Sequence, residues 1–433
     1  MTRGLLFALL AALLTPGAMG RAAQPPGAAK PGAALDNGRG TYVTHRYRNL
    51  FAEAGHEQAE IDARIDAAFQ QLFHGDPDTQ AVYYDAGSNA NGPLAYLSDI
   101  ANHDARTEGM SYGMMIAVQL NHKAEFDALW NWAKTYMYLG SPTHPSHGYF
   151  SWSLKTNGEP NDETAAPDGE EYFVMALYFA ANRWGNGAGI YNYKAQADEI
   201  LTAMRHRERR TGQTKFGERT VAAEVNEDAK MIRFTPVVGK DDFTDPSYHL
   251  PAFYELWARW GPQADRTFWA QAAQASREFF ARTTNARTGL SPDYANFDGT
   301  PHAMKWNAMA THFSFDSWRT QSNWAVDWAW WGKDPREQAL SDRTQAFLAS
   351  QGIGSYADQY TLDGKPLSRR HSTGLVATSA VASLAATQPV KEKFVEELWN
   401  APIPSGHERY YDGMLYLMSL MHVAGEFRIW APQ

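Results

Sequence analysis

The sequence of 433 residues contains no cysteine. Disulfide bonds, thiolate metal sites and cysteine nucleophiles are therefore excluded together. Positive charge is also in short supply, because 39 Lys and Arg residues stand against 48 Asp and Glu residues, a formal net charge of −9. Proteins that bind a phosphate backbone need an excess of cations, so we expect no nucleic-acid partner.

Long apolar runs are missing as well, since no stretch approaches the roughly 20 apolar residues that a membrane-spanning helix needs. The run within Gly4–Leu14 follows Arg3 and precedes Thr15, Pro16 and several small residues. This order of a basic, an apolar and a small-residue region is typical of a cleavable signal peptide. We therefore predict a signal peptide over residues 1–23, export to the periplasm or the medium, and no membrane association after cleavage.

Residues 24–41 are rich in Pro and Gly and almost free of bulky apolar side chains, so we predict a tether there. From Tyr42 onward no comparable low-complexity segment interrupts the chain. The composition, 44% hydrophobic and 20% charged, is that of a globular protein. We predict a single domain over residues 42–433 and a monomeric protein.

Apolar residues recur at intervals of three and four through most of this domain, which indicates amphipathic helices. About twelve such segments occur, at 56–74, 108–121, 123–138, 169–184, 193–208, 247–260, 264–283, 316–332, 336–350, 373–386, 390–398 and 408–425. Short strand-like pieces lie between them, at Val82–Tyr84, Tyr149–Leu154 and Met231–Phe234. Strands do not alternate regularly with helices, which disfavours a doubly wound sheet and a (β/α)₈ barrel. The pattern predicts an all-α fold with two concentric rings of six helices.

Two short motifs carry little weight. The segment Gly109–Gly113 (GMSYG) fits the G-x-S-x-G pattern of serine hydrolases, but a polar stretch precedes it where a buried strand would be required. His144 and His147 lie in a Pro-containing loop, SPTHPSHG, and no H-E-x-x-H motif occurs in the sequence. We expect no metal site and no cofactor.

Three acidic residues, Glu108, Asp168 and Asp316, stand near the starts of separate predicted helices. Any one of them could simply cap its helix and complement the helix dipole. In a double ring, however, the N-terminal ends of the inner helices share one face, so the three carboxylates could converge on one cleft. Two opposed carboxylates with aromatic walls are what glycosidic hydrolysis requires.

The segments around these acids resemble glycoside hydrolase family 8. Residues 166–184 (APDGEEYFVMALYFAANRW) are similar to the family signature, with Asp168, Glu170 and Trp184 at matching positions. Pro167 and Glu170 depart from it, since the family usually has Ser or Thr and Asp at those positions. Residues 104–119 (DARTEGMSYGMMIAVQ) resemble the segment that carries the general acid, and residues 316–319 (DSWR) resemble the segment that carries the general base.

The likeness covers nearly all of residues 45–433, and within the family it is strongest to the reducing-end xylose-releasing exo-oligoxylanases. The resemblance implies an (α/α)₆ barrel, which agrees with the helix count. It also implies that Glu108 protonates the leaving oxygen, that Asp316 activates water on the opposite face, and that Asp168 grips and distorts the sugar at the point of cleavage.

These roles set physical requirements on the site. Glu108 must stay protonated near neutral pH, which calls for burial or a neighbouring carboxylate. Asp316 must stay ionised, which Arg319 one helical turn later would assist, although an ordinary surface pair between the two is the alternative. Asp327, further along the same predicted helix, is the competing candidate for the base.

Three aromatic residues, Trp152, Tyr248 and Tyr411, are candidate sugar platforms or hydrogen-bonding residues, with core packing as the alternative for each.

The segment Leu367–Gly374 (LSRRHSTG) bears on where the substrate ends. In the exo-oligoxylanases that the sequence resembles, a loop at this position closes the cleft beyond the first leaving-group subsite, and its His bonds the β-hydroxyl of the reducing-end xylose. His371 matches that His, whereas Arg370 and Ser372 depart from the usual Leu-His-Pro. The long planar head group of Arg370 could fill the subsite instead. The alternative is that His371 merely caps the helix that starts near Thr373.

We therefore predict an inverting glycoside hydrolase that releases xylose from the reducing end of β-1,4-linked xylo-oligosaccharides. An endo-acting xylanase, β-glucanase or chitosanase of the same family is one alternative. A carbohydrate-binding protein without activity is another, but such a protein has no need of the intact trio of acids.

Overall fold

The computed structural model describes residues 39–239 and 241–432. The predicted signal peptide over 1–23 and residues 24–38 of the predicted tether lie outside the described residues. The described part contains fourteen α-helices and eight short strands. None of its helices combines the length and the apolar character that crossing a membrane would take.

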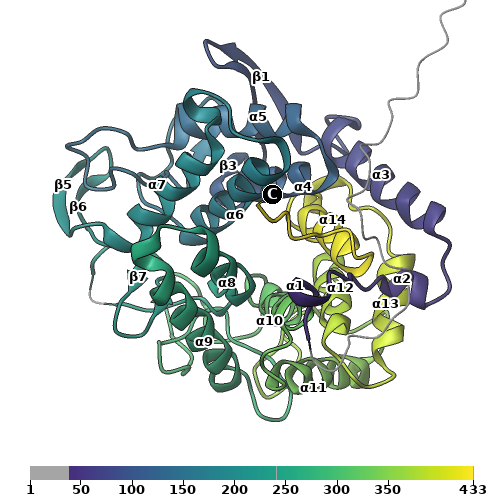
Figure 1. Cartoon of the computed structure of the whole chain (residues 1–433). Coiled ribbons are helices and arrows are strands. Elements are labelled where there is room, and N and C mark those ends of the chain that lie inside the picture. Colours follow the sequence, from purple (N-terminus) through teal and green to yellow (C-terminus); the bar gives the residue numbers. More distant parts are fainter. Residues whose placement is uncertain (1–38, 240, 433) are drawn as a thin grey trace, which may run out of the picture.

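Twelve of the helices form two concentric rings, an (α/α)₆ barrel (Figure 1). The inner ring consists of α4 (Thr107–Leu120), α6 (Pro167–Trp184), α8 (Pro251–Trp260), α10 (Ser317–Trp331), α12 (Thr373–Val381) and α14 (Tyr411–Val423). The outer ring consists of α3 (Gln58–His74), α5 (Lys123–Trp132), α7 (Tyr193–His206), α9 (Arg266–Thr283), α11 (Arg336–Gln351) and α13 (Lys391–Asn400). The remaining helices, α1 (Thr41–Thr44) and α2 (Leu50–Glu53), are single turns.

Each outer helix packs against one inner helix. The pairs α5 and α4, α7 and α6, α9 and α8, α11 and α10, and α13 and α12 are neighbours in sequence, whereas α3 packs on α14 and closes the ring. Inner helices are surrounded by other helices, so they are buried on nearly all sides. In α12 every residue from Gly374 to Val381 is buried. A hydrophobic core runs without interruption through both rings, from Leu50 to Phe427.

The twelve predicted helical segments each contain a helix of the barrel, and the predicted all-α fold is confirmed. Their ends differ where local chemistry intervenes. The segment predicted at 247–260 divides into a 3₁₀ turn, Pro246–Tyr248, and α8, because Pro251 has no N–H to donate and takes the first position of a new helix. The segment predicted at 123–138 changes to a π-helical turn over Ala133–Met137.

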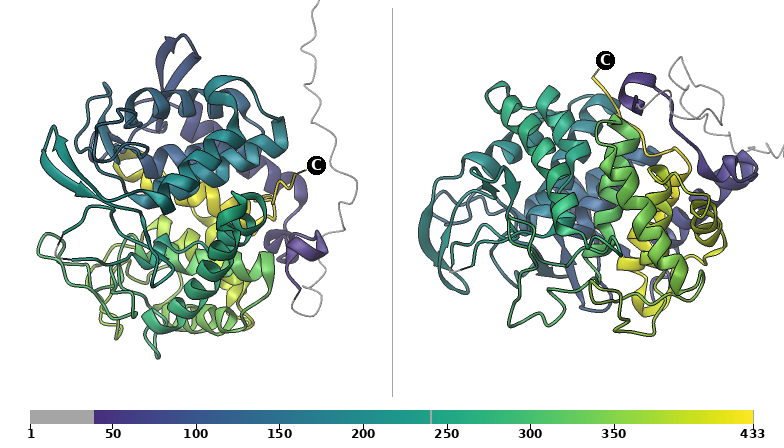
Figure 2. Two further views of the ribbon diagram at one scale, coloured as in Figure 1. Left: turned by 60° about the vertical axis from the view of Figure 1, so that its left-hand side comes forward. Right: turned by 90° about the horizontal axis from the view of Figure 1, so that it is seen from below.

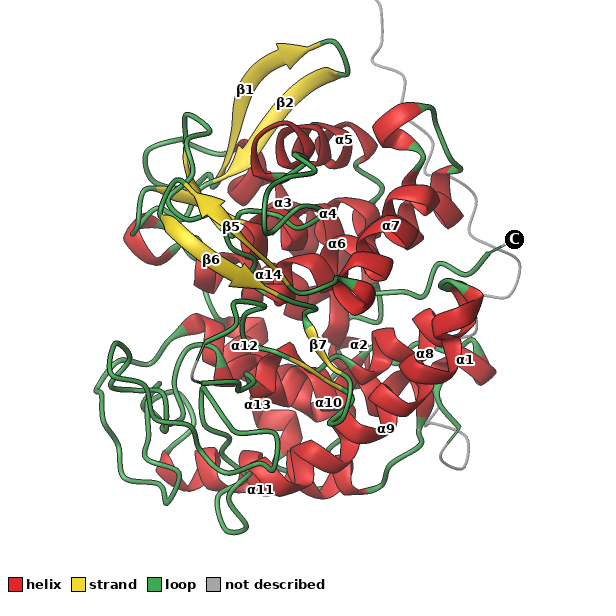
Figure 3. Ribbon diagram, turned by 90° about the vertical axis from the view of Figure 1, so that its left-hand side faces the viewer, coloured by secondary structure: helices red, strands yellow, loops and turns green. Residues whose placement is uncertain are grey.

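The strands form four antiparallel pairs. They are β1 (Tyr83–Asn89) with β2 (Gly92–Leu97), β3 (Asp104–Arg106) with β4 (Ser153–Lys155), β5 (Arg210–Thr214) with β6 (Gly217–Val221), and β7 (Val225–Asn226) with β8 (Met231–Ile232). The hairpins β1–β2 and β5–β6 were not predicted, since residues such as 210–214 (RTGQT) are mostly polar and lack an apolar alternation. The hairpin β5–β6 and the long loops gather on one side of the barrel (Figures 2 and 3).

The folded unit begins before the predicted boundary at Tyr42. Gly40 packs so closely against α10 that a Cβ atom there would lie 2.2 Å from the carbonyl oxygen of Trp330. The buried Thr41 donates its hydroxyl to the carbonyl oxygen of Ala329 at 3.0 Å. Both residues fell in the predicted tether, because a glycine that permits close packing has the same composition signal as a glycine in a flexible segment.

Candidate active site

One arginine joins three carboxylates at the N-terminal ends of three inner helices. Arg319, in the first turn of α10, donates through Nη1 to Glu108 Oε2 at 3.1 Å and to Asp168 Oδ2 at 2.9 Å. Its Nη2 donates to Asp316 Oδ1 at 2.9 Å. The Arg319 side chain is only 6% exposed, so the alternative of an ordinary surface pair is wrong. The structure thus brings the three predicted acids together on one face of the barrel.

Helix capping alone does not account for these acids, although Asp168 Oδ1 accepts a hydrogen bond from the backbone N–H of Gly169 at 3.0 Å. Asp316 occupies the N-cap position of α10, yet its side chain accepts no hydrogen bond from the helix backbone. Glu108 lies in the first turn of α4, and Asp168 follows Pro167 in the first turn of α6. The positive ends of these helices favour carboxylates there. Because all three side chains turn toward Arg319, their geometry is that of a shared site.

Glu108 has the environment that a proton donor requires. Burial, helped by the nearby Asp168 and Asp316, raises the pKa of Glu108 to about 7 against the opposing effect of Arg319. Its Oε1 accepts a hydrogen bond from the Tyr410 hydroxyl at 3.0 Å. A carboxyl group with this pKa carries a proton in much of the population at neutral pH, as general acid catalysis demands.

The other two acids differ in their access to water. The Asp316 side chain is 30% exposed, whereas that of Asp168 is 7% exposed. Burial raises the pKa of Asp168, while Arg319 opposes this shift. Asp316 is therefore the acid that water can reach, and Asp168 is the one that is fixed between helices.

Asp327, the competing candidate for the base, lies in a different environment. It is completely buried and accepts two hydrogen bonds from Arg277 of α9, at 2.6 and 2.8 Å. Arg277 also donates to Glu255 of α8 at 3.0 Å. Asp327 thus joins neighbouring helices and has no access to water in the cleft.

The three aromatic candidates surround the acids. Tyr248 is 5% exposed, and the Arg319 guanidinium lies 6.0 Å from its ring centre. Trp152 is half-buried beside the start of α4, where the Arg106 guanidinium lies 5.4 Å from its ring. The Tyr411 hydroxyl donates to the carbonyl oxygen of Phe315 at 2.9 Å. Tyr248 also packs into the hydrophobic core, and contact of any of the three with a sugar stays a prediction.

Two tyrosines of the site were not predicted from the sequence. The Tyr112 hydroxyl accepts a hydrogen bond from Arg319 Nη1 at 2.7 Å, and Tyr410 donates to Glu108. Tyr112 follows Glu108 by one helical turn, so its side chain lies on the same helix face. Tyr410 approaches closely because residue 109 is glycine, where a Cβ atom would lie 2.5 Å from the Tyr410 ring.

Glu170, which departs from the family signature, does not reach the cleft. It is completely buried, and its Oε1 accepts a hydrogen bond from the backbone N–H of Phe150 at 2.9 Å. Burial raises the pKa of Glu170 to about 8. Glu170 therefore holds the segment that leads to Trp152.

Arg370 and His371 are both bound within the protein. Arg370 donates to Asp358 Oδ2 at 2.6 Å and pairs with Glu408 at 3.0 Å, and its guanidinium lies 5.5 Å from the Phe315 ring. His371 places Nδ1 2.7 Å from the carbonyl oxygen of Tyr356 and Nε2 3.2 Å from Glu397 Oε1.

The N-cap of α12 is Ser372, whose hydroxyl accepts from the Gly374 N–H at 3.2 Å. The alternative that His371 caps this helix is therefore wrong.

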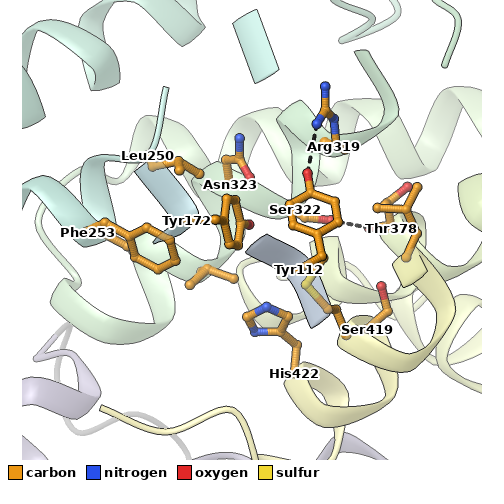
Figure 4. A pocket seen from close by; sticks show the side chains of 14 residues that line it. Tyr112, Tyr172, Leu250, Phe253, Arg319, Ser322, Asn323, Thr378, Ser419 and His422 are labelled. Carbon is orange, nitrogen blue, oxygen red and sulfur yellow. Dashed lines mark hydrogen bonds between the residues drawn. The ribbon is translucent and has the colours of Figure 1, made fainter. Parts of the chain in front are cut away.

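A small cavity lies inside the barrel, on the inner side of the site (Figure 4). Tyr112 and Arg319 line it together with residues further along the inner helices, such as Val326 and His422. Its volume is about 30 Å³, whereas ligand pockets usually measure about 300–1,000 Å³. A sugar does not fit there, and the water-accessible acid Asp316 does not line this cavity.

The two weak motifs have structural explanations. Ser111 lies within α4 and donates its hydroxyl to the carbonyl oxygen of Glu108 at 3.0 Å, so it has no nucleophile-elbow geometry. His144 lies 3.3 Å from Glu163. Across residues 39–239 and 241–432, no group of three or more His, Asp or Glu side chains is arranged to hold a metal ion.

This chain is similar to known proteins over most of their length. Residues 96–425 match the glycosyl hydrolases of family 8. A reducing-end xylose-releasing exo-oligoxylanase of Paenibacillus barcinonensis is 43% identical over 395 residues, 91% of this chain and 99% of that protein. A protein of the same name from Halalkalibacterium halodurans is 42% identical over 399 residues, 91% of this chain and 97% of that protein.

Solved structures also match. A family 8 enzyme from Teredinibacter turnerae in complex with xylobiose is 54% identical and superposes with a TM-score of 0.90, covering 91% of this chain and all 100% of that chain. A catalytic mutant xylanase from the same organism in complex with xylohexaose is also 54% identical, with a TM-score of 0.89 and the same coverage.

Proposed function

This chain belongs to glycosyl hydrolase family 8, and from that membership we propose that it releases xylose from the reducing end of β-1,4-linked xylo-oligosaccharides with inversion at the anomeric carbon. The observation that carries the proposal is the junction at Arg319, which holds a buried acid, a gripping acid and a water-accessible acid around one point. The relatives named exo-oligoxylanases support the choice of substrate and product.

The chemistry uses the different environments of the acids. Glu108 gives its proton to the glycosidic oxygen, which lets the leaving xylose depart without forming an alkoxide. Asp316 takes a proton from water as that water attacks the anomeric carbon from the opposite face. Asp168 accepts hydrogen bonds from the distorted sugar between them. One attack from the opposite face inverts the configuration.

Arg319 keeps these roles separate. Its guanidinium contacts Glu108 and Asp316 through different nitrogens, and its charge favours an ionised partner. In Glu108 burial outweighs this effect, since the pKa is raised to about 7.

Exo-action requires a wall beyond the leaving-group subsite, and we assign that wall to Arg370. It lies over Phe315, the residue before Asp316, and is fixed by Asp358 and Glu408. His371 could reach a sugar hydroxyl only after giving up its contact with Tyr356 or Glu397.

An endo-acting xylanase is the second candidate. The Teredinibacter turnerae structure at 54% identity is named a xylanase. In addition, both ring nitrogens of His371 are occupied by contacts within the protein, so its hydrogen bond to the reducing-end xylose, which the resemblance implies, is not preformed. In this case Arg370 would flank an open cleft.

The product profile on linear xylo-oligosaccharides tests the proposal. Xylotriose should give xylose and xylobiose, with the α-anomer formed first by proton NMR, and the alditol of a xylo-oligosaccharide should resist cleavage. The Arg370→Ala variant should then accept the alditol, while Arg369→Ala, an exposed neighbour, should not. Rapid alditol cleavage by the unmodified enzyme, or a fast fall in xylan viscosity, would establish endo-action.

We also propose that the chain is exported, on the strength of the sequence pattern over residues 1–23. Mass spectrometry of the mature N-terminus would locate the cleavage site, and recovery of the protein only from the cytoplasm, with Met1 intact, would contradict the proposal.

A further inference from the structure

Trp306 is the most exposed large hydrophobic side chain in the described part of the protein, with 62% of its surface accessible. It lies in the long loop between α9 and α10. Exposing most of an indole ring forgoes the stabilisation that its burial would provide. A purely structural role would be better served by a buried ring, so the position calls for an explanation.

The loop holds Trp306 in a defined place. On one side the backbone N–H of His302 donates to the carbonyl oxygen of Tyr294 at 2.8 Å, and on the other the N–H of Tyr294 donates to the carbonyl oxygen of Ala310 at 2.8 Å. The Trp306 ring centre lies 5.6 Å from that of Tyr294. The exposed face is therefore presented by a fixed segment.

A line of aromatic rings connects Trp306 to the catalytic acids. Its ring lies 6.0 Å from Phe234, and Phe234 stacks on Tyr248 at 5.9 Å with an interplanar angle of 14°. Tyr248 in turn lies 6.0 Å from the guanidinium of Arg319. Trp306 is thus the solvent-exposed end of a row of rings that begins at the site of cleavage.

This row leads away from Arg370. In the inner ring α10 lies between α8 and α12. Tyr248 belongs to the 3₁₀ turn before α8, while Arg370 precedes α12. Since Arg370 is the wall beyond the leaving group, Trp306 lies toward the non-reducing part of a bound chain.

We propose that Trp306 is a distal substrate-binding residue, whose exposed face stacks on a xylose unit of longer xylo-oligosaccharides, beyond the sugars that contact the three acids. This inference rests on the proposed function. Xylose rings are uncharged and carry an apolar C–H face, so an aromatic platform suits them. The residue contributes to chain-length preference and takes no part in bond cleavage.

The test compares kcat/KM on xylotriose and xylohexaose for Trp306→Ala, Trp306→Tyr and the control Phe216→Ala. Phe216 is 40% exposed and lies in the β5–β6 turn, outside the row of rings. Trp306→Ala should lower kcat/KM on xylohexaose about tenfold, mainly through KM, and leave xylotriose within about twofold. Trp306→Tyr should keep most of the activity, and Phe216→Ala should behave as the unmodified enzyme on both substrates.

Binding provides a second measurement. In the Glu108→Gln background, the additional change Trp306→Ala should lower the affinity for xylohexaose about tenfold, as measured by calorimetry. An equal loss on both substrates, or none on xylohexaose, would overturn the role of Trp306 while the proposed function stands. Failure of the unmodified enzyme to cleave either substrate would overturn the proposed function and this inference with it.

Discussion

Arg319 shows that a cation alone does not decide the charge of the carboxyl groups beside it. It contacts all three acids, yet Glu108 carries a raised pKa because burial outweighs the cation. Glu108, Asp168, Asp316 and Arg319 could be predicted from motifs that are local in the sequence. Tyr410 could not, because its contact with Glu108 joins the first and the last inner helices of the barrel.

Replacing either proton-transfer residue should stop catalysis and leave the fold intact. Glu108→Gln and Asp316→Asn are near-isosteric, and general acid or base groups are worth roughly 10²–10⁴-fold in rate. Initial rates on xylotriose and far-UV circular dichroism measure the two effects. Near-normal turnover by Asp316→Asn would show that another group is the base.

The rate should fall on the alkaline side as Glu108 loses its proton. Its pKa is raised to about 7, so the acid form dominates below that pH and disappears above it. A profile of kcat/KM against pH should therefore have its alkaline limb near pH 7. A limb that stays flat up to pH 9 would mean that the donor is not Glu108.

Helix α10 carries two acids with different roles: Asp316 stands at its start, and Asp327 is buried in its interior. Asp327→Asn removes the charge that compensates Arg277 and should destabilise the protein by about 3–5 kcal/mol. Activity per folded molecule should survive, because Asp327 contacts neither Arg319 nor the cleft. Urea unfolding measures the stability, and kcat on xylotriose divided by the folded fraction measures the activity per folded molecule; Asp316→Asn is the matched control on the same helix.

The sequence pattern predicted elements wherever a helix had an apolar stripe. It found the start of β1, through the strand-like piece Val82–Tyr84, but it missed β2 and the whole β5–β6 hairpin, because pairing between strands is a contact that periodicity cannot show. The same limit applies to the packing of α3 on α14, which joins opposite ends of the chain.

Several carboxyl groups are buried in the protein, and we expect them to remain protonated in the folded state. Burial raises the pKa of Glu170 and of Asp293 to about 8. In the unfolded chain these carboxyl groups have a pKa of about 4. Between that pH and about pH 8 they bind fewer protons in the unfolded chain than in the folded protein, so the free energy of unfolding falls as the pH rises. The free energy of unfolding should therefore be lower at pH 8 than at pH 6.5.

The window above pH 6.5 avoids the opposite effect of His249 and His422, whose pKa is lowered to about 3. Urea unfolding at several pH values measures the slope, and Glu170→Gln should make it shallower. An unchanged slope in that variant would mean that Glu170 is already ionised in the folded protein.

The attachment of Gly40 to the far end of α10 has a practical consequence for a catalyst bound to a solid support. Helix α10 has 15 residues, and at 1.5 Å per residue it keeps that attachment about 20 Å from Asp316. The segment around Trp430 is also held at this far end of the barrel, because the Trp430 carbonyl oxygen accepts a hydrogen bond from Asn182 near the end of α6. A linker joined just upstream of Gly40 would orient every immobilised molecule with its acids toward the solution, where long substrates arrive.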